Sequence, residues 1–557
     1  MRSPSVTPGS FSDVQTLSIT PYNLYRTLDR VHGSSVGRQV RSGQRVVVVG
    51  AGAGGLSAAI DLAASGAEVT LVERASAVGG KIRQLEVEGH GIDSGPTVVT
   101  MRSVFEELFA DAGADFHSYV PTTAAQTLAR HAWADGPVFD LHHDVEATEA
   151  EIRRLFDGAN ADGYRRFVAY ARDIYGEVED VFIQSAKPSL LRAMGIVGMR
   201  GVSAVRKIDW RRTMWGALAD FFPDRRLRQL FGRYATYYGS SPFRAPATLN
   251  LIAHVEQQGV WTIDGGMIEL VRGFERLARE LGVEIRCGEP VEELEVEGGR
   301  VTAVLTSSGR LEADAVVFNG DPAALAGGLL GGGVRRAGNR VTERKRSLSA
   351  VTWSMVAAAE GFALEHHNVF FSDDYPSEFE RLASAELPHE PTVYVCAQDR
   401  RGADRPRPGA RERLLCLVNA PAFGDRRSLS TQETERCERR TLDLMARCGL
   451  TLTDRSSVMT TPAEFEGLFP ATGGALYGPA CHGSMAPFTR PAARTKLGRL
   501  YLVGGGAHPG AGVPMVTMGG RIAARAVRED LRLTAPSRRA ATSGGTSTSS
   551  ATTVGTR

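Results

Sequence analysis

The sequence predicts an α/β fold, and the pattern of its first hundred residues carries that prediction. An apolar run, RVVVVG at 45–50, is followed by the small-residue segment GLSAAIDLAASG at 55–66 and by a second apolar run, AEVTLVER at 67–74. This order is typical of a strand, a helix and a parallel strand, as in a Rossmann-like unit. Strand character returns only near 283–318, which indicates that a second domain of mixed sheet and helices is interleaved with this unit.

Length and composition limit the classes of protein that fit. A chain of 557 residues predicts two or three domains, and its net charge of +2 gives no reason to expect a nucleic-acid partner. The six cysteines are scattered, with no CxxC pair and no set of neighbouring histidine ligands. We therefore expect neither a disulfide framework nor a metal site, and we interpret the histidine pairs 142/143 and 366/367 as loop residues.

The glycine turn after the first strand predicts a dinucleotide site. Gly50, Gly52 and Gly55 form GxGxxG, and Ala51 and Gly54 complete the turn. Glycine permits a tight turn and lets main-chain N–H groups approach a pyrophosphate at the start of a helix.

An acidic residue and two further turns extend this prediction. Glu73 ends the second strand, where a carboxylate accepts hydrogen bonds from ribose hydroxyls. GGK at 79–81 and GIDSGPTVV at 91–99 continue the unit, whereas a simple NAD domain would enter another strand and helix. These residues favour FAD and a glutathione-reductase-like FAD-binding domain.

The middle of the chain predicts helices, then a β-meander. Residues 145–280 are mostly helical, with a break at Pro242 and Pro246, and 283–318 indicate a meander with a hairpin at Gly298-Gly299. The apolar stretch 347–364 contains Glu360 and predicts a buried strand and turn rather than a membrane span. The N-terminus has no apolar core of a secretory signal.

We predict the following domain organisation from these patterns. Both ends are polar and are expected to be disordered. The predicted parts are a disordered N-terminal extension at 1–42, an FAD-binding domain at 43–125, 265–330 and 495–534, a substrate and membrane-associating domain at 126–264 and 331–494, and a disordered tail at 535–557.

A second glycine-rich segment stands near the end of the chain. LYLVGGGAHPGAGVPM at 500–515 follows a strand-like run, and with the earlier motifs it resembles the flavin amine oxidase and phytoene desaturase superfamily. The resemblance implies that this segment closes over the flavin ring. It implies the following cofactor-binding residues: Gly50, Ala51, Gly52, Gly54, Gly55, Glu73, Arg74, Gly80, Lys81, Gly95, Pro96, Val291, Gly504, Gly505 and Met515. Because VGGGAHPG contains no acid, main-chain groups are expected to replace the carboxylate that holds ribityl hydroxyls in other flavin oxidases.

Three longer stretches narrow the resemblance. Residues 92–113, 230–267 and 469–491 are similar to bacterial carotenoid desaturases, and most of all to 1-hydroxycarotenoid 3,4-desaturases. The similarity spans roughly 44–532. It implies FAD-dependent desaturation of an acyclic carotenoid. Phytoene-type desaturases and carotene isomerases share most of these motifs and remain alternatives, and a non-catalytic isoprenoid carrier of the same architecture is an alternative from another class.

The resemblance also suggests residues for the chemistry. His508 would lie beside the flavin, either as a general base or as a structural histidine that bonds to the glycine segment. Candidate substrate residues are aromatic side chains for an apolar tunnel and two polar groups near a substrate hydroxyl: Tyr234, Tyr237, Tyr238, Trp261, Arg233 and His254.

The substrate class implies a bilayer, because a carotenoid cannot diffuse through water. Residues 189–218 mix apolar side chains with arginines and are expected to contact the lipid surface, although a core helix with a basic face has the same pattern. We expect a cytoplasmic protein attached peripherally to the inner face of the membrane. The electron acceptor, oxygen or a quinone, is left open, and no second nucleotide motif predicts NAD(P)H dependence.

Overall fold

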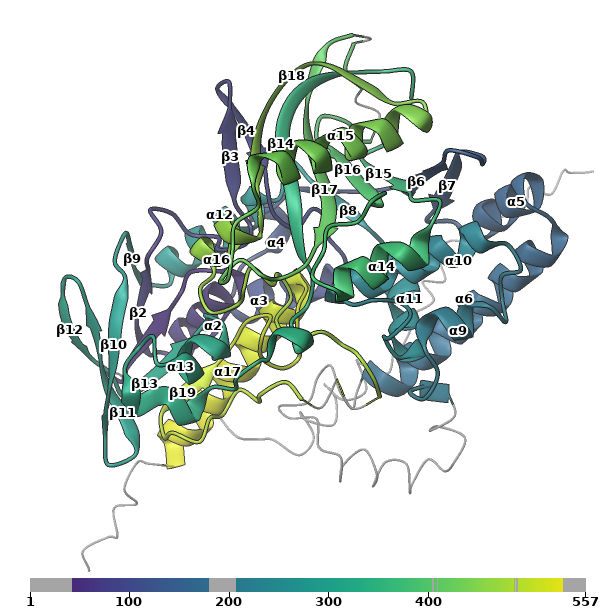
Figure 1. Cartoon of the computed structure of the whole chain (residues 1–557). Helices are drawn as coiled ribbons and strands as arrows, with labels where there is room; N and C mark the ends of the chain where they lie inside the picture. The colour runs from purple at the N-terminus through teal and green to yellow at the C-terminus, as the bar shows by residue number, and fades with distance from the viewer. Residues whose placement is uncertain are drawn as a thin grey trace, which may run out of the picture.

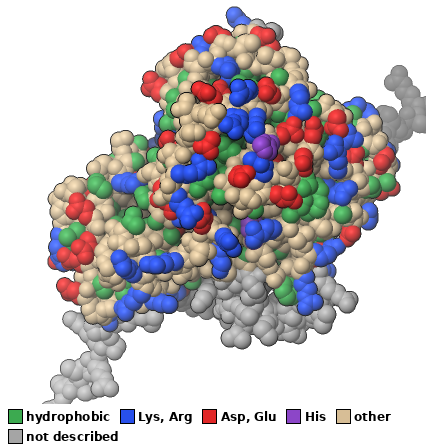
Figure 2. All heavy atoms as spheres, in the orientation of Figure 1, with side chains coloured by type: hydrophobic (Ala, Val, Ile, Leu, Met, Phe, Trp, Pro, Cys, Tyr) green, Lys and Arg blue, Asp and Glu red, His purple; other side chains and the backbone are tan. Residues whose placement is uncertain are grey.

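The computed structural model describes residues 43–533 except 180–206, 403–404, 408, 485 and 487–488. Within these residues a parallel sheet and a larger mixed sheet are flanked by a helical region, as Figure 1 shows. Figure 2 shows cations and anions interspersed over one face of the molecule, in keeping with the small net charge. The ends predicted to be disordered lie outside the described residues.

The first sheet consists of five parallel strands, as the strand–helix–strand pattern predicts. β1 is its central strand and pairs in parallel with β2 and β13. Because it is covered on both faces, β1 is a run of four buried valines rather than an alternating pattern. In sheet order, the strands are β19 (Leu500–Leu502), β13 (Ala315–Phe318), β1 (Arg45–Val49), β2 (Glu68–Glu73) and β9 (Glu284–Cys287).

Three helices cover this sheet: α2 (Ala53–Ala64), α12 (Ile268–Glu280) and α17 (Val513–Leu533). The first and last of them meet backbone to backbone. A Cβ atom at Gly520 would lie 2.3 Å from the carbonyl oxygen of Gly54, and Ser57 Oγ donates to the carbonyl of Thr517 at 2.8 Å. The start of the described chain is thus fixed against its end.

The predicted β-meander is confirmed for part of its length. β10 (Val291–Glu297), β11 (Arg300–Thr306) and β12 (Gly309–Glu312) are antiparallel, and Gly298 and Gly299 form the first hairpin with φ of 56° and 78°. The flanking residues of 283–318 do not belong to it. They form β9 and β13, which join the parallel sheet beside β2 and β1: β13 is buried along its whole length, and β9 is a partly buried edge strand.

The second sheet has seven strands and curves over the top of Figure 1. Its strand β14 confirms the buried strand predicted within 347–364. Only the β15–β6 pair is parallel among the paired strands of this sheet that the structure describes. In sheet order, the strands are β18 (Thr451–Thr460), β14 (Ser349–Glu360), β17 (Arg411–Ala420), β16 (Val393–Ala397), β15 (His367–Phe371), β6 (Thr127–Trp133) and β7 (Phe139–His142).

A helical region lies between β7 and β14 in the chain, as predicted for 145–280. The break at Pro242 and Pro246 separates two short 3-10 segments. The elements are α5 (Val145–Leu155), α6 (Gly158–Val178), α9 (Met214–Leu218), α10 (Arg225–Gly232), η2 (Arg233–Tyr238), η3 (Ala247–Asn250) and α11 (Leu251–Gln257).

Shorter elements connect these parts. Two small sheets are β3 (Gln84–Val87) with β4 (His90–Asp93), and β5 (Thr122–Ala124) with β8 (Trp261–Ile263). The remaining helices are α3 (Ser103–Asp111), α4 (Phe116–Tyr119), α13 (Pro322–Gly327), η4 (Gly332–Ala337), η5 (Glu343–Lys345), α14 (Tyr375–Ala383), α15 (Thr431–Arg447) and α16 (Pro462–Leu468).

No helix in the described part of the chain has both the length and the apolar character needed to cross a bilayer. The segment predicted to touch lipid, 189–218, lies mostly outside the described residues. In its described part, Arg212 pairs with Asp209 and Asp220, and Arg211 stacks on Trp210.

We expect the buried ion pair between Arg400 and Glu412 to hold the second sheet to its neighbouring loop. The Arg400 Nη2 and Nε atoms lie 2.7 and 2.8 Å from the carboxylate, whose side chain is 1% exposed. Glu412→Ala leaves a buried cation unpaired and should lower the free energy of unfolding by about 3 kcal/mol. Glu295→Ala, which breaks an exposed pair with Arg310, should cost less than about 1 kcal/mol. Urea unfolding measures both, and equal losses would contradict the prediction.

Candidate active site

The glycine turn, residues 50–55, has the backbone geometry of a close approach between strand and helix. Gly50 has φ of +100°, and a Cβ atom at Gly55 would lie 2.0 Å from the carbonyl oxygen of Gly50. Gly52 is the N-cap of α2 and no side chain caps this helix. A Cβ at Gly52 would meet a single atom within 4 Å, Asn319 Nδ2 at 3.0 Å. The turn is therefore closed on its inner side and leaves room for an anionic group at the start of α2.

Glu73 holds the same turn from the neighbouring strand. Its Oε2 accepts a hydrogen bond from the main-chain N–H of Ala51 at 2.7 Å, and its Oε1 accepts one from Ala75 at 2.9 Å. The carboxylate is buried and retains lone pairs beyond those used in these two hydrogen bonds. Arg74 points away from this carboxylate and donates to the carbonyl oxygens of Gly467 and Leu468.

The second glycine pair packs on the first. Gly79 forms a bridge with Gly52, and a Cβ at Gly80 would lie 3.2 Å from the Cα of Gly52. Lys81 follows; its Nζ donates to the carbonyl of Leu476 at 2.5 Å, and burial lowers the pKa of its ammonium to about 8. Gly95 is required nearby because a Cβ there would lie 1.9 Å from the Lys81 carbonyl oxygen.

The glycine loop, residues 504–512, lies next to the glycine turn because α17 packs on α2. Arg490 supports it: the guanidinium donates to the carbonyls of Gly505, Tyr477 and Pro479. Burial lowers the pKa of Arg490. His508 is buried, and its main-chain N–H donates to Pro491 at 2.9 Å.

An acidic group absent from the sequence motif is supplied by the turn between β13 and α13. Asp321 Oδ1 caps α13 through the N–H of Ala323, and a Cβ at Gly506 would lie 2.9 Å from Asp321 Oδ2. Burial raises the pKa of this carboxyl, while Lys81 and Arg490 oppose the rise. The sequence prediction named only main-chain groups at this place and did not anticipate a carboxylate that the turn after β13 brings to the loop.

A cavity of about 590 Å³ adjoins the glycine loop. Gly95 and Pro96 form one part of its wall, and His508 and Met515 another. The rest of the wall is mainly apolar and comes from η3, α11 and the second sheet: Leu249, Leu251, Ile252, Val255, Leu415 and Leu417. Such a space suits an apolar rod with few polar anchoring points.

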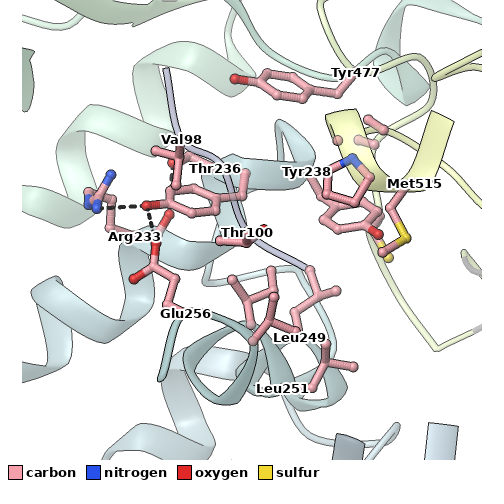
Figure 3. A pocket seen from close by; sticks show the side chains of 18 of the residues that line it. Val98, Thr100, Arg233, Thr236, Tyr238, Leu249, Leu251, Glu256, Tyr477 and Met515 are labelled. Carbon is pink, nitrogen blue, oxygen red and sulfur yellow. Dashed lines mark hydrogen bonds between the residues drawn. The ribbon is translucent and has the colours of Figure 1, made fainter. Parts of the chain in front are cut away.

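One side of this cavity is polar. Tyr234 and Tyr237 donate to the two oxygens of Glu256 at 2.5 and 2.7 Å, and Arg233 Nη2 donates to Tyr237 Oη at 3.1 Å. Figure 3 shows Arg233 and Glu256 of this network on the opposite side of the cavity from Met515. Burial raises the pKa of Glu256, and Arg233 opposes the rise. Glu256 was not singled out from the sequence because nothing local marks it as facing a cavity.

The structure separates the predicted substrate residues. Arg233, Tyr237 and Tyr238 line the cavity. Tyr234 does not; it lies behind Glu256 with its ring 2% exposed.

The placements of His254 and Trp261 correct the sequence prediction. The cavity wall takes Ile252, Val255 and Glu256 from α11, whereas His254 leaves the helix on another face, packs on Tyr175 and bonds to Gln258. Trp261 belongs to β8 and stacks under the guanidinium of Arg102, outside the cavity wall.

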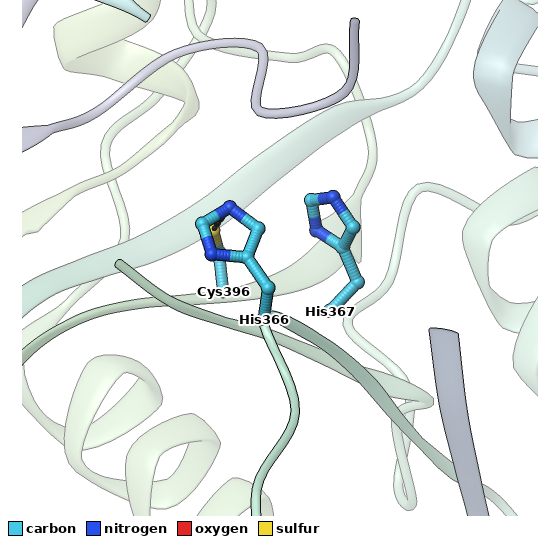
Figure 4. A group of neighbouring side chains, drawn as sticks. All are labelled: His366, His367 and Cys396. Atoms are coloured by element: carbon cyan, nitrogen blue, oxygen red, sulfur yellow. Dashed lines mark hydrogen bonds between the residues drawn. The ribbon is translucent and has the colours of Figure 1, made fainter. Parts of the chain in front are cut away.

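One member of each histidine pair differs from its prediction as a loop residue, whereas His143 and His366 do lie outside helices and strands. His142 ends β7 and bonds to Glu151, and His367 lies in β15. Cys396 joins the second pair because it is the β16 partner of His367, and its Sγ lies 3.6 Å from His366 Nε2 (Figure 4). The Nδ1 atom of each histidine has a partner: His366 Nδ1 bonds to the carbonyl of Arg400, and His367 Nδ1 to Tyr394 Oη, whereas His367 Nε2 has no hydrogen-bond partner among the described residues.

Val291 and Met515 complete the predicted cofactor set. Val291 begins β10, partly buried at the edge of the core beside the parallel sheet. Met515 stands in the first turn of α17 and lines the cavity.

Comparison with known proteins agrees with this geometry. Residues 53–528 match the sequence profile of the flavin containing amine oxidoreductase family. A hydroxyneurosporene desaturase of Rubrivivax gelatinosus is 48% identical over 92% of this chain and 98% of its own length, and one of Cereibacter sphaeroides is 42% identical over 87% and 98%. The fold resembles putrescine oxidase bound to putrescine, with a TM-score of 0.56 at 16% identity, over 87% of this chain and 98% of that one.

These findings confirm the predicted α/β fold, the family and FAD as the cofactor. The glycine turn and Glu73 fit that cofactor, since they offer a helix N-terminus to a diphosphate and a carboxylate to a ribose. The chain belongs to the flavin containing amine oxidoreductase family and is an FAD-dependent oxidoreductase.

Proposed function

We propose that this protein desaturates an acyclic carotenoid and that it forms the 3,4 double bond of a 1-hydroxycarotenoid. The observation that supports this function most strongly is the apolar cavity beside the glycine loop, in a chain 48% identical to a hydroxyneurosporene desaturase. A non-catalytic carrier is disfavoured, because Gly50, Gly52, Gly55 and Glu73 keep the geometry of a nucleotide site.

We assign the diphosphate of FAD to the glycine turn and the adenosine ribose to Glu73. Gly80, Lys81, Gly95 and Pro96 border the path from the turn to the cavity. We place the flavin ring beside Gly504, Gly505 and Met515, and the adenine beside Val291. The segments 43–125, 265–330 and 495–534 thereby form the FAD-binding domain, and 126–264 with 331–494 the substrate domain.

The bound cofactor supplies a two-electron oxidant for a carbon–hydrogen bond. The protein's own residues align the substrate and exclude water, because the carbons that react have no polar neighbour to activate them. The leucines of η3, α11 and β17 provide the apolar wall for this alignment. We assign to His508, which lines the cavity beside the glycine loop, the removal of the proton from the neighbouring carbon.

The substrate implies where the enzyme works. A carotenoid resides in the bilayer, so we propose that the protein is cytoplasmic and attaches to the inner face of the membrane through 189–218. A membrane quinone or oxygen would then receive the electrons, and the chain offers no second nucleotide motif for a nicotinamide.

The reaction is tested by supplying 1-hydroxyneurosporene or phytoene in liposomes and following the red shift of polyene absorption. We expect the shift with the hydroxylated substrate. Desaturation of phytoene alone would contradict the 3,4-desaturase assignment and support a phytoene-type enzyme. The same liposomes without oxygen, with or without added quinone, identify the electron acceptor.

Substitution of Gly52 tests the cofactor assignment. The Gly52→Val side chain would project into the space before α2 and should abolish flavin retention, while φ of −70° imposes no strain on the fold. Visible flavin absorbance and circular dichroism measure the two effects. As a contrast, Gly55→Val should destabilise the fold itself, because its Cβ would lie 2.0 Å from a carbonyl oxygen. Flavin retained by Gly52→Val would place the diphosphate elsewhere.

Substitution of His508 tests the proton acceptor. His508→Ala should retain flavin and substrate but slow the bleaching of flavin in an anaerobic single turnover by about 100-fold, the usual effect of losing a general base. Near-normal bleaching would show that His508 is structural.

A further inference from the structure

The polar side of the cavity forms a small chamber, defined by Arg233, Tyr237, Glu256 and Tyr375. All four residues line the cavity, and they come from η2, α11 and α14. Three of them are joined by hydrogen bonds from Arg233 to Tyr237 and from Tyr237 to Glu256 (Figure 3). The Arg233 chamber is thus a prearranged set of polar groups within an otherwise apolar space.

Charge in the Arg233 chamber is balanced without a ligand. Arg233 contributes one positive charge and Glu256 one negative charge. Nearby histidines add none, because burial and the Arg233 guanidinium lower the pKa of His131 and His367 well below its usual value. A carboxylate or phosphate would upset this balance, whereas an uncharged oxygen would not.

Two buried polar atoms of the chamber lack hydrogen-bond partners in the described structure. They are Arg233 Nε and Tyr375 Oη, and the Tyr375 side chain is only 2% exposed. Two histidine atoms near Arg233, His131 Nδ1 and His367 Nε2, also lack a hydrogen-bond partner among the described residues. A buried polar atom without a hydrogen-bond partner destabilises the folded protein. Because several such atoms gather around the Arg233 guanidinium, we expect a polar group of a ligand to form the missing hydrogen bonds.

We infer that the Arg233 chamber is the subsite for an uncharged oxygen atom at the end of the substrate, a hydroxyl in the first instance. Arg233 Nε and Tyr375 Oη donate to the oxygen, and Glu256 is positioned to accept its hydrogen. Tyr234 and Tyr237 are positioning residues that hold the Glu256 carboxylate. This inference rests on the proposed function for the identity of the substrate.

The position of the chamber relative to the glycine loop agrees with 3,4-desaturation of a 1-hydroxy substrate. Carbon 3 is two bonds from carbon 1, so the hydroxyl and the reacting carbons must lie close together. η2 provides this proximity: Arg233 begins it and Tyr238, which faces Arg490 and Gly510 of the loop region, ends it. The five-residue step from Arg233 to Tyr238 along a 3-10 helix covers about 10 Å. Two side chains that face each other, with a short carbon segment between them, bridge this distance.

Equilibrium binding tests the inference without turnover. The flavin is first reduced with dithionite, and 1-hydroxyneurosporene or neurosporene is then titrated while tryptophan fluorescence is followed. We expect the native protein to bind the hydroxylated compound about 10-fold more tightly. Tyr375→Phe and Arg233→Lys should each reduce this ratio severalfold, while Tyr238→Phe, the same chemical change on the opposite side of the cavity, should preserve it.

The possible results distinguish a failure of the proposed subsite from a failure of the proposed reaction. Equal affinity of the native protein for both carotenoids, or an unchanged ratio in both Tyr375→Phe and Arg233→Lys, would overturn the inference. If Arg233→Lys loses its flavin or its fold, Arg233→Met combined with Glu256→Gln removes both charges together and takes its place. A hydroxyl preference that disappears in the variants, with no desaturated product from the reoxidised enzyme, would support the subsite and refute the proposed reaction.

Discussion

The backbone contact between α2 and α17 determines where the active site forms. At Gly54 and Gly520 the two helices approach so closely that a side chain on either would collide with the opposite main chain. This contact places the glycine loop, more than 400 residues later in the sequence, beside the glycine turn. Both runs of glycine are therefore needed for one site. Between them in the sequence lie further strands of the same parallel sheet, together with the second sheet and the helical region, which supply much of the cavity wall.

The parts of the fold that depend on local sequence could be predicted. The first strand, the glycine turn and α2 follow from four valines, three spaced glycines and a run of small residues, and the hairpin follows from Gly298-Gly299. Sheet membership across long separations could not. The segments around Ile285 and Val316 were predicted to extend the meander, yet they pair with the parallel sheet, because strand pairing is decided by which apolar face finds a partner in the folded chain.

The same limit applies to the candidate site. Main-chain geometry at the glycine turn was predictable, since only glycine tolerates it. The direction in which a helical side chain points depends on how the helix is docked: α11 presents Glu256 to the cavity and His254 to Tyr175, although the two are neighbours in sequence. Cys396 escaped notice for a related reason, because its proximity to His367 is a property of strand register. Asp321, likewise, reaches the glycine loop from the start of α13, far away in the sequence.

Burying charge beside an apolar substrate is physically unfavourable unless every charge has a partner. In this cavity Arg233 is linked to Glu256 through the hydroxyl of Tyr237, and Arg490 donates to three carbonyl groups. Both cations therefore have partners. Polar groups that bond only to one another would add rigidity alone, whereas Arg233 Nε has no hydrogen-bond partner among the described residues. A hydrocarbon rod offers no feature by which its position along a tunnel can be fixed. A single oxygen at one end supplies such a feature, and a preformed polar chamber then sets which carbons face the glycine loop.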